Sequence, residues 1–111
     1  MSSEADDVLT HIKYCVVAKQ YRVRSHAMRH MIEEGFDENH LLETLTGKLQ
    51  LLEEYEDENR CLVLGRFHFS SSARSPLHVV CDISHPEVVD IVTAYIPQRP
   101  WWISPTRRGK L

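Results

Sequence analysis

Three strand-like segments of the C-terminal half carry side chains that together could cleave a phosphodiester bond. These side chains are Arg60, Arg66, His78 and Tyr95. Metal-independent cleavage of RNA needs a group that removes the 2′-hydroxyl proton, a group that protonates the leaving 5′-oxygen, and cations beside the phosphate. His78 suits the proton transfer because an imidazole titrates near neutral pH. The two arginines could bind the phosphate in a bidentate manner, and Tyr95 could position the substrate or protonate it.

A second set of candidates lies in the segment 26–34. His26 would occupy the first turn of a helix, where the positive end of the helix dipole favours a phosphate, and Arg29 and His30 share its face of that helix. Arg107 in the basic tail is a further candidate for substrate binding. His26 and His30 have the i, i+4 spacing of a zinc pair, but the Glu of an H-E-x-x-H motif and a third ligand are missing. We therefore expect no metal and no cofactor.

Each candidate has an ordinary structural alternative. A strand histidine such as His78 can be satisfied by a neighbouring carbonyl group, and Tyr95 can be a packed aromatic residue whose hydroxyl group has a partner. Arg60 and Arg66 can be solvated or paired with glutamate. His26 can form a hydrogen bond between a helix and the sheet.

The residues after Pro97 form a basic and aromatic tail. Pro100 and Pro105 interrupt regular structure, so the tail is predicted to be an irregular segment over the sheet. Trp101 and Trp102 could stack bases above a basic strip. Adjacent tryptophans in such a tail can equally cover a sheet edge or contact a protein partner. The cations of this tail are Arg99, Arg107, Arg108 and Lys110.

Three helices are predicted in the N-terminal half. Apolar residues recur at helical spacing within 3–19, and Ser25 can cap a second helix over 26–34 that ends at Gly35. A third helix starts after Asp37 as its N-cap and stops at Gly47. The residues expected on the buried faces of the second and third helices are Ala27, Met28, Met31, Ile32, Leu41, Leu42 and Leu45. The segment 21–24 is predicted to be a short extended linker.

Four strands are predicted to follow, over 49–55, 60–69, 77–84 and 88–96, because the apolar period changes from 3.6 to 2. Helices followed by strands, without long crossovers, predict a single α+β domain over 1–111 with the helices on one face of an antiparallel sheet. Alternation assigns to the helix-covered face Cys61, Val63, Phe67, Leu77, Val79 and Cys81. It assigns to the opposite, exposed face Arg60, Arg66, His68, His78 and Tyr95.

Charge is unevenly distributed along the 111-residue chain, whose net charge is −3. The segment 8–32 contains no acid, the segment 33–58 contains ten acids against Lys48 alone, and the tail is basic again. One pole could therefore attract phosphate while the other repels it. Solvated helix faces of opposite sign would give the same pattern, and the overall acidity by itself argues against a nucleic-acid binder.

The cysteines and the N-terminus indicate a cytoplasmic protein. Cys15, Cys61 and Cys81 are odd in number, lack a C-x-x-C spacing and lie within apolar patterns, so we expect reduced thiols in the core. The N-terminus is acidic and has no signal-peptide pattern. No apolar run approaches the roughly 20 residues that span a bilayer.

Several short motifs, in order, resemble a widespread bacterial family of unknown function. They are S-H-A-M-R-H-M-I-E-E-G-F at 25–36, R-C-L-V-L-G-R at 60–66, L-H-V-V at 77–80 and T-A-Y-I-P at 93–97. The similarity covers about residues 21–108. This family is itself similar to the RelE, ParE and BrnT toxins. The resemblance therefore implies a RelE/BrnT-like domain, with helices packed on a roughly four-stranded antiparallel sheet.

The resemblance also implies a function. RelE-like members are metal-independent endoribonucleases encoded with antitoxins that bind and block them, whereas ParE-like members share the fold and poison gyrase. His30 and Glu34 stand where the family pattern commonly has arginine, so this helix is less basic. We expect a toxin-type endoribonuclease with proton transfer by His78 and His26 and positioning by Tyr95, and with RNA and an antitoxin as partners. The alternative is a non-enzymatic protein-binding module or a gyrase-type toxin.

Overall fold

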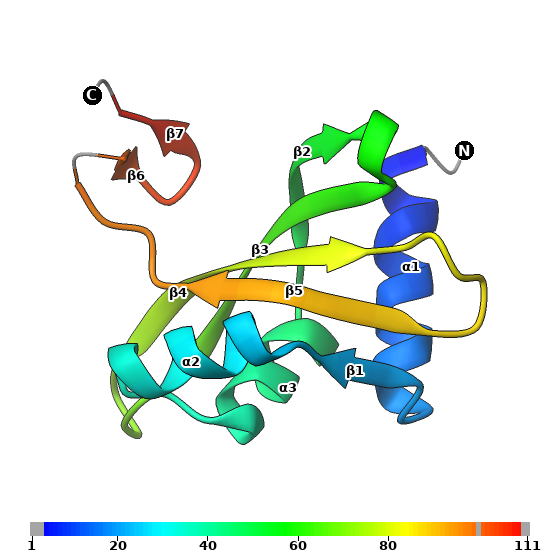
Figure 1. The fold of residues 1–111 in the computed structure, drawn as a ribbon. Coiled ribbons are helices and arrows are strands. Elements are labelled where there is room, and N and C mark those ends of the chain that lie inside the picture. Colours follow the sequence, from blue (N-terminus) through cyan, green and yellow to red (C-terminus); the bar gives the residue numbers. More distant parts are fainter. Residues whose placement is uncertain (1–3, 100, 110–111) are drawn as a thin grey trace.

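Three helices and a five-stranded sheet make up the computed structural model, which describes residues 4–99 and 101–109 (Figure 1). The helices are α1 (Glu4–Val17), α2 (Ser25–Glu34) and α3 (Glu38–Thr46), and a 3-10 turn covers Glu56–Glu58. The strands are β1 (Tyr21–Val23), β2 (Gln50–Tyr55), β3 (Arg60–His68), β4 (Arg74–Asp82), β5 (Val89–Tyr95), β6 (Trp102–Ser104) and β7 (Arg107–Arg108).

The large sheet has the strand order β1-β5-β4-β3-β2, and β6 pairs with β7 in a separate hairpin. Figure 1 shows this hairpin at the upper left, beyond the end of β5. No helix of the described residues is long and apolar enough to cross a membrane. Ser3, Pro100 and Lys110, which entered the predictions above, lie outside the described residues.

The prediction of an α+β fold is confirmed, but the sheet has a fifth strand where a linker was predicted. Tyr21–Val23 forms β1 and pairs in parallel with β5, so the sheet is mostly rather than wholly antiparallel. Residues 21–24 alternate, but a segment this short does not distinguish a strand from an extended linker. The tail also differs from the prediction, because Trp102–Ser104 and Arg107–Arg108 form a hairpin.

The helix ends follow the predicted capping chemistry in part. α2 ends at Gly35, whose φ of 82° is the left-handed conformation that glycine adopts readily. The Asp37 side chain accepts a hydrogen bond from the His40 N–H, and the His40 ring accepts one from the Asp37 N–H, which caps α3. The predicted cap of α2 is wrong. Ser25 is already helical, and Arg24 holds the cap position without a side-chain cap bond.

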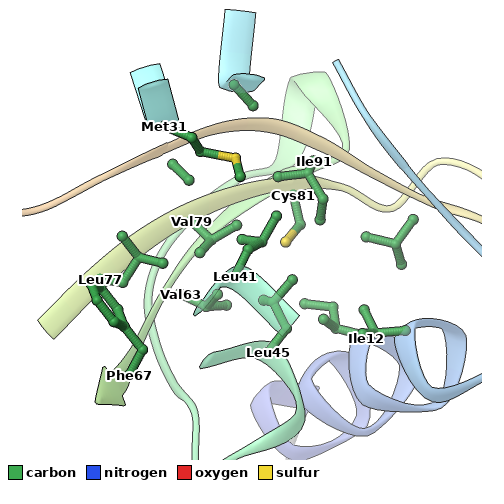
Figure 2. Packing of buried hydrophobic residues seen from close by; sticks show 14 of the residues in the cluster. Ile12, Met31, Leu41, Leu45, Val63, Phe67, Leu77, Val79, Cys81 and Ile91 are labelled. Atoms are coloured by element: carbon green, nitrogen blue, oxygen red, sulfur yellow. The ribbon is translucent and has the colours of Figure 1, made fainter. Parts of the chain in front are cut away.

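One hydrophobic cluster joins all three helices to one face of the sheet (Figure 2). Ile12 of α1, Met31 of α2, and Leu41 and Leu45 of α3 all belong to it. The strand residues of β3 and β4 in this cluster are Cys61, Val63, Phe67, Leu77, Val79 and Cys81. These are the residues that alternation assigned to the helix-covered face.

The predicted buried stripe of α2 is wrong at two positions. Ala27 and Met31 are buried, but the Met28 side chain is 50% exposed and Ile32 is 81% exposed. Helical spacing groups the four residues on one side of α2, yet α2 contacts the sheet only along part of that side. Two large apolar side chains of α2 therefore remain at the surface.

A β-bulge in β5 decides which side of the sheet Tyr95 faces. Cys81 of β4 pairs with Ile91, whereas the preceding residue, Val80, pairs with Thr93. The extra residue in β5 turns Thr93 and Tyr95 to the side opposite Ile91. Strict alternation would have kept these three side chains on one face.

Gly65 of β3 allows α3 to approach the sheet closely. A Cβ atom at this position would lie 2.6 Å from Thr44 Cγ2 and 3.0 Å from the Thr44 carbonyl oxygen. Thr44 is fully buried and its hydroxyl group donates to the His40 carbonyl, so it cannot move aside easily. We expect Gly65→Ala to lower the free energy of unfolding by about 1–3 kcal/mol in urea denaturation. An unchanged midpoint would show that α3 has room to shift away from β3.

The three cysteines are free and buried, as predicted. Burial raises the pKa of the Cys61 thiol to about 12 and also raises the pKa values of Cys15 and Cys81. The protonated thiols therefore act as small apolar side chains, and none is a nucleophile at neutral pH.

Candidate functional site

His78 lies on the side of β4 opposite the core, directly across from Tyr95 of β5. It is fully buried, because the β6–β7 hairpin packs against it. The His78 Nε2 atom is 2.6 Å from the carbonyl oxygen of Pro105, between β6 and β7. The ring of Trp102 meets the His78 ring edge-on, with the centroids 4.3 Å apart. A neighbouring carbonyl group thus satisfies His78, which is the structural alternative weighed above.

The hydrogen bonds of His78 define its proton positions. A carbonyl oxygen only accepts, so Nε2 carries the hydrogen that it donates to Pro105. Burial lowers the pKa of His78, which favours the neutral ring, and Nδ1 is then free to accept from the Tyr95 hydroxyl group at 3.3 Å. Burial raises the pKa of the Tyr95 hydroxyl group, and the neighbouring Trp102 side chain opposes this rise. His78, Tyr95 and Trp102 therefore form a fixed polar contact between sheet and hairpin.

An ion pair attaches the other strand of the hairpin to the sheet. Arg108 of β7 donates to both carboxylate oxygens of Glu53 on β2, at 2.9 and 2.8 Å. The Tyr55 hydroxyl group also donates to Glu53. The Arg108 guanidinium lies over the Trp102 ring, 4.5 Å from its centroid. Arg108 holds the pKa of the Glu53 carboxyl group below its usual value.

A pocket of about 560 Å³ opens where the hairpin meets α2 and the end of β5. Its size is that of a site for a small molecule or one nucleotide. The pocket combines an imidazole, two carboxyl groups, a guanidinium and aromatic rings. The lining residues are His30, Glu33, Glu34, Tyr95, Ile96, Gln98, Trp101, Trp102 and Arg108.

Glu34 is the most unusual group in this pocket. Its Oε1 atom accepts a hydrogen bond from the Ile96 N–H at 3.1 Å, while its Oε2 atom is buried and makes no hydrogen bond to the residues that the structure describes. Burial raises the pKa of Glu34, although the Ile96 N–H and the charge of His30 oppose this change. A carboxyl group with a raised pKa in a pocket is a typical proton-transfer group.

His30 lies one helical turn before Glu34 and lines the same pocket. The ring of His26 packs against the His30 ring with the centroids 4.6 Å apart, and His26 is exposed. Of the three predicted catalytic residues, Tyr95 lines the pocket, and His26 packs against the lining residue His30. The third, His78, supports Tyr95 from beneath the hairpin.

A family model described as a domain of unknown function, DUF4258, matches residues 23–96, about two thirds of the chain. The chain belongs to this family. The comparisons of this chain with curated proteins and with solved structures found no match.

The DUF4258 match divides the pocket into two parts. His30, Glu33, Glu34, Tyr95 and Ile96 lie within the matched residues. The lining residues outside the match are Gln98, Trp101, Trp102 and Arg108. The groups with acid–base chemistry therefore belong mainly to the DUF4258 domain, and the aromatic groups beside them belong mainly to the C-terminal segment.

The predicted arginine sites lie elsewhere in the DUF4258 domain. Arg66 is exposed and pairs in register with Pro76, on the same side of the sheet as His78 but beyond it. Arg60 is opposite Asp82, 3.7 Å from its carboxylate. Leu64 is the partner of His78 in the sheet, and Arg60 lies four positions away from Leu64 along β3. Four positions of a strand correspond to a distance of about 13 Å. The structure does not bring Arg60 to the pocket.

The sheet face predicted to be exposed is covered at its centre. Leu62 and Leu64 lie on the same face of the sheet as His78 and are buried like it. His68, at the end of β3, pairs with Glu43 of α3 instead of lying free. Alternation identified the correct side for His78, but it carries no information about which segment covers that side.

Two further candidates of the prediction, Arg29 and Arg107, are exposed and do not line the pocket. Conversely, the predicted site residues did not include Glu34 or Glu53, and Arg108 was named only as one of the cations of the tail. The i, i+4 spacing of His30 and Glu34 was a signal for their proximity. Ile96, which donates to Glu34, is 62 residues away in the chain, and Arg108, which donates to Glu53, is 55 residues away, so no local pattern could indicate these two contacts.

Proposed function

We propose that this protein is a toxin-type, metal-independent endoribonuclease whose active site is the pocket between α2, the end of β5 and the hairpin. The observation that carries the proposal is the juxtaposition of His30 and Glu34 in this pocket, with the pKa of Glu34 raised by burial. An imidazole and a carboxyl group are a suitable acid–base pair for transesterification of RNA. In this proposal the family is related to the RelE, ParE and BrnT toxins, and the protein acts in the cytoplasm.

The two groups have complementary roles. The Glu34 carboxylate accepts the proton of the 2′-hydroxyl group as the 2′-oxygen forms its bond to phosphorus. The His30 imidazolium donates a proton to the 5′-oxygen as the bond from phosphorus to that oxygen breaks. The products are a 2′,3′-cyclic phosphate and a 5′-hydroxyl end, so protons and bonds balance without a metal ion.

The other pocket residues position the substrate. Tyr95 has its hydroxyl group engaged by His78, so it serves as a fixed wall and not as a proton donor. Arg108 uses part of its guanidinium for Glu53 and is 55% exposed, which leaves N–H groups for a phosphate oxygen. His26, packed on His30, keeps the acid–base ring in place. His78 becomes a positioning residue in this scheme.

Binding of a protein partner is the second candidate function. The exposed Met28 and Ile32 of α2 border a small apolar hollow that also includes Val23 and Phe36. Exposed apolar side chains of this kind favour a protein contact. In a toxin–antitoxin pair this surface would contact the antitoxin. A binding module without catalysis would use the same surface.

Cleavage of single-stranded RNA in EDTA tests the proposed function. We expect 2′,3′-cyclic phosphate ends from the native protein and about 100-fold slower cleavage by His30→Gln. His85→Gln, in the exposed loop between β4 and β5, is the matched control and should cleave normally.

Expression in bacterial cells separates the alternatives. Growth arrest with RNA loss supports the nuclease. Arrest with intact RNA indicates a gyrase-type toxin, and normal growth together with inactivity in vitro indicates a binding module. Either of these last two results would overturn the proposed function.

A further inference from the structure

We propose that Trp101 is a base-stacking residue that makes single-stranded RNA, with an unpaired base placed in the pocket, the substrate class of this site. This inference rests on the proposed function and adds a binding role for a residue outside the DUF4258 match. It starts from the different environments of the two adjacent tryptophans.

Trp102 is structural and Trp101 is available to a ligand. Trp102 is 4% exposed, with its ring against His78 and under the Arg108 guanidinium. Trp101 is 58% exposed and lines the pocket. Of these two tryptophans, Trp101 has the exposed ring that a base can stack on, whereas Trp102 covers the sheet.

The Trp101 backbone is fixed although its side chain is exposed. The Gly109 N–H donates to the Trp101 carbonyl oxygen at 2.8 Å, and the Trp102 N–H donates to the Gln98 carbonyl oxygen at 3.0 Å. These bonds, together with the buried Trp102 ring, hold Trp101 at the edge of the pocket before any ligand arrives. A preorganised aromatic surface loses little conformational entropy when it binds.

The chemistry around Trp101 fits an unpaired nucleotide. An indole ring stacks on any base and is tolerant of sequence, and Arg99 and Arg107 are exposed cations near it in the chain that can contact the flanking phosphates. A base inside a duplex is stacked on both faces and paired at its edge, so it cannot enter a pocket of one-nucleotide size. The site thus favours single strands over duplexes.

The test uses an RNA that cannot be cleaved, so binding is measured apart from catalysis. A fluorescently labelled 2′-O-methyl octaadenylate is titrated with protein, and binding is followed by anisotropy. We expect Trp101→Ala to weaken binding by about 5- to 150-fold, the range for loss of one stacked base. Trp101→Phe should restore part of the affinity. Phe69→Ala removes an exposed aromatic side chain at the β3–β4 turn, outside the pocket lining, and should bind like the native protein.

Two further ligands sharpen the outcome. The octamer annealed to its complement should bind more weakly than the single strand, and so should an abasic octamer that keeps the phosphates. Equal binding of the abasic octamer, or unchanged binding by Trp101→Ala, would overturn the stacking role. If Trp101→Ala weakens binding but the native protein does not cleave ordinary RNA, the nuclease proposal is rejected and the stacking subsite is kept. If the native protein cleaves RNA but Trp101→Ala binds normally, the stacking subsite is rejected and the nuclease proposal is kept.

Discussion

Glu34→Gln should slow RNA cleavage by about 100- to 10,000-fold, the usual contribution of a general acid–base group. It should at the same time raise the free energy of unfolding at neutral pH. Glu34 is partly buried and its Oε2 atom has no partner among the described residues, so its ionised form destabilises the folded protein. A neutral amide removes that penalty while it removes the base. Loss of activity with a gain in stability is the signature of a strained functional group.

The pH dependence of this stability gain follows from the sign of the pKa change. The pKa of Glu34 is raised in the folded protein, so the folded state holds its proton more tightly than the unfolded chain does. As pH rises through the unfolded value of about 4.3, the unfolded chain loses the proton first and native stability falls. The increase in the free energy of unfolding caused by Glu34→Gln should therefore be small at pH 4 and should grow toward neutral pH.

Urea denaturation at several pH values and a cleavage assay measure the two effects. Glu87→Gln is the matched control, because Glu87 is exposed in the loop between β4 and β5, and it should change neither quantity. A Glu34→Gln protein that cleaves RNA at the native rate would remove Glu34 from the mechanism. Lower stability at pH 7 would instead show that its carboxylate has a stabilising partner.

The sequence patterns predict the long elements of this fold well and the short ones poorly. β3 and β4 are nine residues each, long enough for alternation to identify their core-facing residues. β1 has three residues and β7 has two, which is too short for a period to identify either segment as a strand. Their pairing depends on tertiary contacts such as Tyr21 beside Val89.

The site was harder to predict than the fold because it is assembled across long stretches of chain. Alternation placed His78 opposite the core, and the bulge in β5 then brought Tyr95 to the same side. Neither pattern could show that Pro105 and Trp102 would cover His78. The position of Glu34 likewise depends on a residue far along the chain, because its Oε1 atom accepts a hydrogen bond from the Ile96 N–H.

The hairpin connects stability to substrate binding. It carries Trp101 and Arg108 into the pocket, and its contacts with the sheet include the His78–Pro105 hydrogen bond, the packing of the Trp102 ring on His78 and the Arg108–Glu53 ion pair. A change that detaches the hairpin should therefore open the pocket on one side without unfolding the core cluster. His78 offers the most direct way to make that change.

His78→Ala should detach the hairpin and lower the free energy of unfolding by about 2–4 kcal/mol. The substitution removes the ring on which Trp102 packs, leaves the Pro105 carbonyl without its donor and leaves the Tyr95 hydroxyl group without its acceptor. Urea denaturation measures the stability. The tryptophan emission maximum should also move to longer wavelength, because Trp102 is 4% exposed in the native protein and becomes solvated when the hairpin leaves.

The same substitution should alter the acid limb of the stability curve. The pKa of His78 is lowered in the folded protein, so native stability falls as pH drops below the unfolded value of about 6.5. Without the imidazole this part of the pH dependence should disappear. His85→Ala, a change at an exposed loop histidine, should stay within about 0.5 kcal/mol of the native protein. Reduced stability with unchanged tryptophan emission would mean that Arg108 and Glu53 hold the hairpin without help from His78.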